Sequence, residues 1–186
     1  APESEQSASG MKLTLSRELS FKSRDDLVKQ LQSDDSVPMK IFSLSGSPCD
    51  CVIVGLDGGL DTWAPEIKPV MCISGINHGP NLAVDVLHSG TVSAARESCL
   101  YGMPALSVSL ATYEHINFLD MIEGAIQVIE SCVDILPKVP VNLLRGKGVS
   151  QMPDISGSID SIRQHFADAN IFLNLNAPNE WNGKFT

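Results

Sequence analysis

The sequence has no apolar run approaching the roughly 18 residues that a membrane span requires. Its first residues, Ala1-Pro2-Glu3-Ser4, form neither the basic region nor the apolar core of a signal peptide. Basic residues are also few, since 13 Lys and Arg face 22 Asp and Glu, for a net charge of −9. Broad electrostatic binding to a nucleic acid polymer or an anionic membrane is therefore disfavoured. An acidic chain that handles phosphate needs a metal ion or focused amide donors to offset repulsion.

Two common catalytic motifs are absent. The chain contains no Gly-x-x-x-x-Gly-Lys-Ser/Thr phosphate loop and no Gly-x-Ser-x-Gly nucleophile elbow. The glycine-rich stretch 55–59 falls where a helix is expected to end, and C-capping explains it. A nucleoside triphosphatase or a serine hydrolase is therefore disfavoured.

The cysteines give no sign of a disulfide framework or a zinc site. They are odd in number, five in all, and most lie in apolar stretches. We expect buried, reduced thiols in an intracellular, cytoplasmic protein. Cys49 and Cys51 are spaced too closely for a zinc half-site. The chain also lacks an initiator Met, so we expect its true start to lie upstream.

Strand and helix patterns alternate along the chain, which predicts an α/β fold with a mainly parallel sheet and helices on both faces. With 186 residues and no internal repeat or second boundary, residues 1–186 are expected to form a single domain. The predicted strands are Lys12–Leu15, Met39–Leu44, Val70–Ile76, Ala105–Leu110 and Ile171–Leu175. The predicted helices begin near Ser23 and at Pro48, Ser89 and Ile116, the last running to Leu136, while 137–160 is left unassigned.

The segment from Asn77 to Thr91 is the expected functional site. Val70–Ile76 has the apolar character of a central parallel strand, and a helix opens at Ser89-Gly90-Thr91. Ligands of such folds bind at the carboxyl ends of strands. A helix N-terminus offers unpaired N–H groups and a positive dipole end, which suits phosphate.

Two stretches that overlap the ends of this segment, SGINxGPNL (74–82) and SGTVxAARE (89–97), resemble the SurE survival-protein family. Three shorter stretches, 1–7, 45–51 and 172–178, match family motifs more weakly and occur in the same order along the chain as in the family. The resemblance implies a Rossmann-like core and a metal-dependent acid phosphatase or nucleotidase that hydrolyses nucleoside monophosphates or similar small phosphate esters. It also implies a homo-oligomer.

By position, the resemblance assigns Asn77 and Ser7 to two of the family's four metal ligands, with Mg²⁺ or Mn²⁺ as the cofactor. The metal would bind a phosphoryl oxygen and lower the pKa of a water molecule. Asn81, Ser89, Gly90 and Thr91 match the residues that cradle phosphate.

Other parts of the family's pattern are missing. The two remaining ligands are aspartates of an N-terminal Asn-Asp-Asp-Gly motif, which this sequence lacks, as it lacks the dimerising C-terminal arm. Ala83 and Val84 stand where the family usually has Gly-Asp, and His88 where it has an aromatic residue. Because carboxylates provide most of the attraction for a divalent ion, we expect the 186 residues alone to have little activity.

Each candidate also has a structural interpretation. Asn77 is a plausible turn residue and Ser7 a surface serine, while Ser89 and Thr91 suit a helix N-cap and first turn. His78 or His88 could protonate a leaving oxygen, but neither has an evident catalytic partner. The alternative function is a non-catalytic phosphate- or nucleotide-binding relative that keeps the amide cradle.

Overall fold

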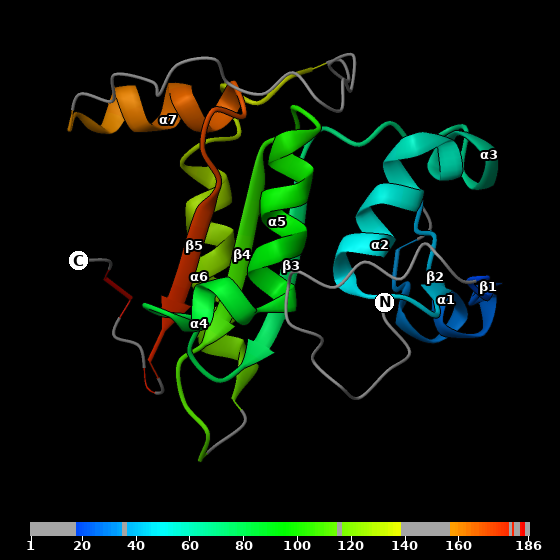
Figure 1. The fold of residues 1–186 in the computed structure, drawn as a ribbon, viewed down its shortest axis with the longest axis horizontal. Helices are drawn as coiled ribbons and strands as arrows, with labels where there is room; N and C mark the ends of the chain where they lie inside the picture. Colours follow the sequence, from blue (N-terminus) through cyan, green and yellow to red (C-terminus); the bar gives the residue numbers. More distant parts are fainter. Residues whose placement is uncertain are drawn as a thin grey trace.

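A computed structural model describes residues 18–34, 37–114, 117–138, 157–178, 180 and 183–184. Its centre is a parallel sheet of three strands in the order β3-β4-β5 (Figure 1). A separate antiparallel pair, β1-β2, lies near the N-terminal end of the described chain. The strands are β1 Phe21–Ser23, β2 Phe42–Leu44, β3 Cys72–His78, β4 Ala105–Leu110 and β5 Leu173–Ala177. None of the helices in these ranges is long and apolar enough to cross a membrane.

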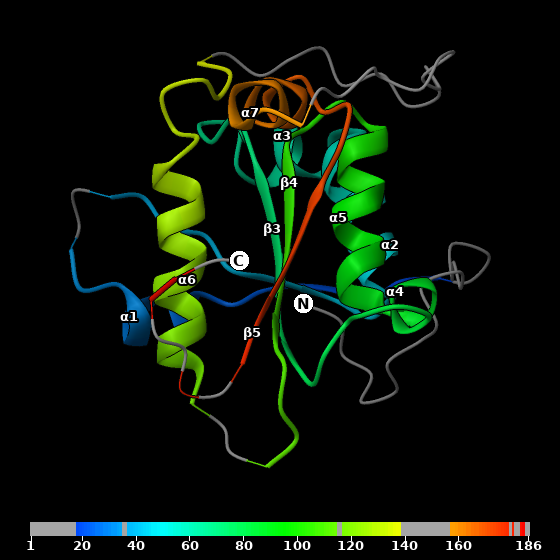
Figure 2. The same ribbon diagram turned by 90° about the vertical axis from the view of Figure 1, so that its left-hand side faces the viewer.

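Helices cover both faces of the parallel sheet, as Figure 2 shows. Helix α5 (Gly90–Leu100) packs on one face and α6 (Phe118–Glu130) on the other. The α6 face is apolar, because every second residue of β4 joins its core cluster of Leu106, Val108, Leu110, Met121, Ala125 and Ala177. The mixed α/β fold with helices on both faces is thus confirmed.

The opposite face of the sheet is lined with hydroxyls and amides. Parallel partners share a side of the sheet, so the register gives two polar rows, Ser74-Ser107-Asn174 and Asn77-Ser109-Asn176. Ser107 Oγ donates to Asn174 Oδ1 at 2.9 Å. Ser107 and Asn174 thus satisfy each other, whereas Ser109 and Asn176 bond to Asn81.

An irregularity in β3 brings Asn77 onto this polar face. The register slips by one residue between Ser74 and Asn77, because three steps along β3 match two along β4. Gly75 lies in the slip with a φ of +135°, and a Cβ there would collide with the Val108 carbonyl oxygen. Only glycine fits this position without displacing β4.

The N-terminal helices begin at or near their predicted starts. The observed elements are α1 Asp25–Leu31, α2 Pro48–Val54, the kinked segment η1 Gly55–Gly59 and α3 Leu60–Trp63. A capping box of Ser47 and Asp50 starts α2, as the Ser-Pro sequence favours. The predicted helix end at Gly58-Gly59 is confirmed, because Asp57 and Gly58 have non-helical backbone angles, with Gly58 at φ +105°, and a separate short helix begins at Leu60.

Four further expectations need correction. Among the described strands, β4 is central and β3, which covers Cys72–His78 where Val70–Ile76 is predicted, has one neighbour. Helix α6 is shorter than 116–136, because the chain turns after Glu130. Helix α7 (Ile159–Ala167), capped by Ser158, begins inside the unassigned stretch. Strand β5 runs two residues later than expected and includes Asn176. The predicted strand Lys12–Leu15 lies outside the described residues.

Candidate phosphate site

The segment 77–91 crosses the carboxyl end of the parallel sheet and leads into α5 (Figure 1). The sequence predicts a loop over this segment, but part of it is regular structure. Asn77 and His78 belong to β3, and a short helix, α4 (Asp85–His88), lies before α5. This is the edge of the sheet at which ligands of parallel α/β folds bind.

Asn77 holds its amide in a defined orientation. Its Nδ2 donates to the Gly79 carbonyl oxygen at 2.9 Å, so its Oδ1 is the atom that faces the helix. Thr91 Oγ1, in the first turn of α5, lies 3.5 Å from that Oδ1. The expected metal ligand and part of the expected phosphate cradle are therefore neighbours.

Asn81 is fixed by the sheet. It is 4% exposed, and its backbone N–H donates to Asn176 Oδ1 at 2.8 Å. Its Nδ2 donates to Ser109 Oγ at 2.7 Å, and its carbonyl oxygen accepts from Asn174 Nδ2 at 2.8 Å and from Asn176 Nδ2 at 3.3 Å. Because its backbone N–H is already bonded internally, the geometry favours Asn81 as an anchor of the segment.

The start of α5 has the form of an anion site. Ser89 is the N-cap, and its Oγ accepts from the Val92 N–H at 3.1 Å. Gly90 and Thr91 occupy the first two helical positions, where an N–H group has no acceptor within its own helix. Two backbone donors and the positive end of the helix dipole therefore converge beside Asn77.

The described residues do not by themselves suit a divalent metal ion. They contain no cluster of three His, Cys, Asp or Glu side chains that could hold one. Asn77 contributes a neutral oxygen, whereas Mg²⁺ and Mn²⁺ bind chiefly through carboxylates. His78, Asp85 and His88 are exposed, and Ser7 lies outside the described residues.

Four polar residues of the site were missed by sequence reasoning: Ser107, Ser109, Asn174 and Asn176. The sequence does contain a pattern that indicates them, because polar residues occupy every second position of the two apolar strands β4 and β5. Such alternation in a parallel strand marks one polar face, which β4 presents beneath α5 although all its residues are buried.

The chain belongs to the SurE family, described as Survival protein SurE, which it matches over residues 1–186. The 5'-nucleotidase SurE of Thermoanaerobacter sp. (strain X514) is 34% identical over 173 residues, covering 93% of this chain and 61% of that protein. The 5'-nucleotidase SurE of Desulforamulus reducens is 34% identical over 184 residues, covering 99% and 56%. The chain thus spans about six-tenths of the length of these relatives.

A solved structure gives the same fold. The chain is similar to the crystal structure of the SurE protein from Aquifex aeolicus, with a TM-score of 0.56 and 24% identity. The match covers 90% of this chain and 49% of that one.

Proposed function

We propose that the protein is a phosphomonoesterase of the nucleotidase type, and that it holds the phosphate group at the N-terminus of α5. The membership of the SurE family and the relatives named 5'-nucleotidase support this class. The observation that carries the proposal is the 3.5 Å approach of Thr91 Oγ1 to Asn77 Oδ1, which joins the helix start to the end of β3. A small phosphate ester is the expected substrate.

In this proposal the chain's own residues bind and orient the phosphate. The N–H groups of Gly90 and Thr91 donate to its oxygens, Ser89 keeps the first turn in place, and Asn81 fixes the approach of the segment. A divalent ion, Mg²⁺ or Mn²⁺, would supply the activation of water, with Asn77 and Ser7 as proposed auxiliary ligands. Neutral oxygens alone hold such an ion weakly.

The isosteric variant Asn77→Asp tests the site. Without metal, a carboxylate at position 77 repels phosphate, so inorganic phosphate should bind about tenfold or more weakly by calorimetry. The same variant should bind Mn²⁺ more tightly than the parent chain, because it gains an anionic ligand. Asn117→Asp, at the N-cap of α6, is the matched control and should change neither affinity. If Asn77→Asp leaves phosphate and Mn²⁺ affinities unchanged, residue 77 does not face the ligand.

A second candidate function is favoured by the neutral character of the described donors. Amides and hydroxyls are able to bind phosphate without performing the chemistry of hydrolysis. Calorimetry with a nucleoside monophosphate, with and without Mg²⁺, combined with a phosphate-release assay, separates the two functions. Metal-independent binding without release favours a phosphate- or nucleotide-binding protein. Robust metal-dependent release by the 186-residue chain favours the enzyme and contradicts the expectation of little activity.

A further inference from the structure

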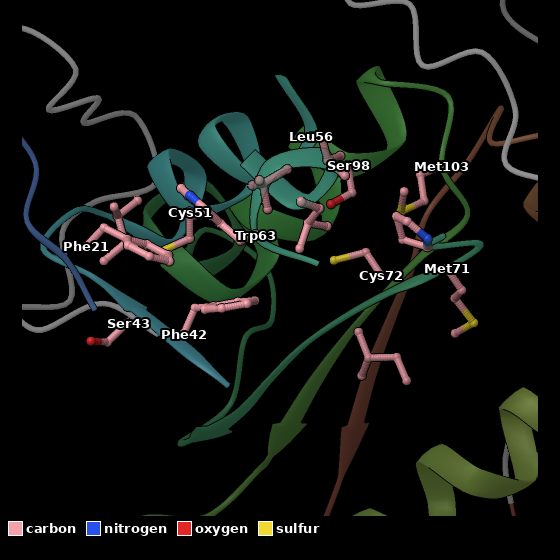
Figure 3. A pocket seen from close by; sticks show the side chains of 16 residues that line it. Phe21, Phe42, Ser43, Cys51, Leu56, Trp63, Met71, Cys72, Ser98 and Met103 are labelled. Atoms are coloured by element: carbon pink, nitrogen blue, oxygen red, sulfur yellow. The ribbon is translucent and has the colours of Figure 1, made fainter. Parts of the chain in front are cut away.

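An apolar pocket of about 380 Å³ lies far from the proposed phosphate site. It opens between the pair β1-β2 and the start of β3, where Cys72 and Ile73 line it (Figure 3). Asn77 lies near the other end of β3, about 15 Å further along a strand that rises about 3.3 Å per residue. The part of a small ester that carries the phosphate therefore needs a different surface, at the carboxyl end of the sheet.

Tyr113 is an exposed aromatic side chain at that end. It follows β4 by three residues, and the chain leaves β3 and β4 at the same edge of the sheet (Figure 1). Tyr113 is 69% exposed, more than any other Phe, Tyr or Trp in the described ranges. Its turn is fixed by hydrogen bonds from the Thr112 N–H to the Leu110 carbonyl oxygen at 2.8 Å and from the Glu114 N–H to Thr112 Oγ1 at 3.2 Å. A large aromatic ring is thus held in water at the edge where ligands of this fold bind.

Gly79 connects this ring to the phosphate site. A Cβ on Gly79 would lie 2.5 Å from Tyr113 Cε1, so the Tyr113 ring lies directly against the Gly79 backbone. The Gly79 carbonyl oxygen accepts from Asn77 Nδ2 at 2.9 Å, and the Gly79 N–H donates to the Leu110 carbonyl oxygen at 2.9 Å. The Tyr113 ring and the Asn77 amide therefore contact the same residue, which is itself bonded to β4.

His78 and Phe118 support the ring from the side of α6. Side chains alternate along a strand, so His78 points to the face opposite Asn77. The His78 ring centroid lies 6.4 Å from that of Tyr113 and 6.5 Å from that of Phe118, the first residue of α6. Phe118 in turn packs on the apolar core. Because Gly79 covers one side of the Tyr113 ring and most of the residue is exposed, the ring has an open face.

We propose that Tyr113 is a specificity residue, which stacks on a flat aromatic group of the substrate such as the base of a nucleoside monophosphate. This inference rests on the proposed function, in which the phosphate binds at the N-terminus of α5. Aromatic side chains bind bases through their ring faces and with little preference among bases. Glu114, next to the ring in the chain, disfavours a second anionic group there. The favoured substrate is therefore a monophosphate whose remainder is aromatic and uncharged.

Calorimetry without metal compares three probes that share a phosphate: adenosine 5'-monophosphate, ribose 5-phosphate and inorganic phosphate. The parent chain should bind the nucleotide about tenfold more tightly than ribose 5-phosphate, because only the nucleotide has a base to stack. Tyr113→Ala should abolish this difference and leave the affinities for ribose 5-phosphate and inorganic phosphate unchanged. Tyr113→Phe keeps the ring and should bind all three probes like the parent. Leu119→Ala removes a side chain that is 68% exposed in the first turn of α6, and as the matched control it should change no affinity.

The outcomes separate this inference from the proposed function. Equal affinities of the parent chain for the nucleotide and ribose 5-phosphate would overturn the stacking role and leave the phosphate site standing. Weaker binding of all three probes by Tyr113→Ala would overturn it too, because the ring would then act through Gly79 and Asn77. If none of the probes binds, the proposed function fails together with the inference. Nuclear Overhauser effects between the base and the Tyr113 ring protons of the parent chain keep the test valid if Tyr113→Ala fails to fold, and their absence at saturating nucleotide would contradict stacking.

Discussion

Asn81 connects the phosphate segment to the two strands β4 and β5 through residues that lie far away in the sequence. Its partners Asn174 and Asn176 are 93 and 95 positions distant, and Ser109 is 28 positions distant. A buried amide side chain is costly unless its polar atoms are bonded. The buried position of Asn81 therefore depends on its hydrogen bonds to residues of β4 and β5.

Asn176→Ala should destabilise the fold and loosen the site. It leaves the backbone N–H of Asn81 without its acceptor, which costs about 1–3 kcal/mol. Asn174→Ala is the matched control and should cost less, because the Asn81 carbonyl oxygen also accepts from Asn176 and Ser107 also contacts the Leu173 carbonyl oxygen. Urea unfolding measures both. A larger loss for Asn174→Ala would contradict the assigned roles.

Ala83→Gly should stabilise the protein. Ala83 has a φ of +49°, in the left-handed region that costs a residue with a Cβ about 1–2 kcal/mol. Glycine removes this cost but adds entropy to the unfolded chain, so a net gain of about 0.5 kcal/mol is expected. The same substitution at Ala94, inside α5, should instead destabilise the protein by about 1 kcal/mol. A loss of stability in Ala83→Gly would exclude backbone strain at this position.

Helix α5 is the element that links the fold to the site. It packs on β3 and β4, and α2 packs on its other side. Its first turn contributes the proposed anion donors, while Val92 and Ala95 are fully buried. The buried side chains of this helix therefore fix where its N-terminus points.

Ser89→Ala should destabilise α5 by about 1 kcal/mol, because the Val92 N–H loses its acceptor. Ser89→Gly should cost only a few tenths of a kcal/mol, about the difference that glycine shows at N-caps. Thermal and urea unfolding of the two variants check the order. If Ser89→Gly is as harmful as Ser89→Ala, the capping hydrogen bond is not the main contribution of this residue.

Elements with clear local signals were predicted well from the sequence. Ala105–Leu110 has the predicted bounds, and α5 begins at the expected cap and ends at Leu100. Helix α7 was missed because its signals, a serine cap and a short apolar pattern, follow a Pro- and Gly-rich stretch. The glycine pair correctly indicates the end of the first helix, but the helix that begins at Leu60 is a single turn, too short to show a pattern of its own.

The site could be predicted in part. The position of residues 77–91 at the end of a strand and before a helix follows from local sequence. The hydrogen bonds of Asn81 could not be predicted, because they depend on the register of β5 against β4 and on the slip in β3. The metal roles of Asn77 and Ser7, and the phosphate roles of Asn81, Ser89, Gly90 and Thr91, stay predictions.

At the scale of the whole molecule, the buried cysteines make the free energy of unfolding depend on pH. All five are free thiols, and burial raises the pKa of Cys49 and of Cys99 from 9.0 to about 11. In the unfolded chain these thiols titrate near their ordinary value. Between pH 9 and 11 the unfolded state therefore binds fewer protons than the folded state.

The free energy of unfolding should accordingly fall as the pH rises from 9 towards 11, and this contribution should be fully present below pH 9. Urea unfolding at several pH values across this range measures the slope. Burial also raises the pKa of Cys51 and of Cys72, so Cys99→Ala removes one of four contributing thiols and should give a shallower fall than the parent. A midpoint that rises with pH, or an unchanged slope in Cys99→Ala, would show that other groups dominate.

The parallel sheet also separates two kinds of side chain, with hydrocarbon towards α6 and hydroxyls and amides towards α5. Substitutions on opposite faces share few partners, and effects at such independent positions add. Substitutions among the polar side chains that face α5 can thus change ligand binding, while the apolar side chains that face α6 continue to stabilise the sheet. Changes in the α5 layer therefore cost the hydrogen bonds that they remove, but they leave the apolar packing on α6 intact.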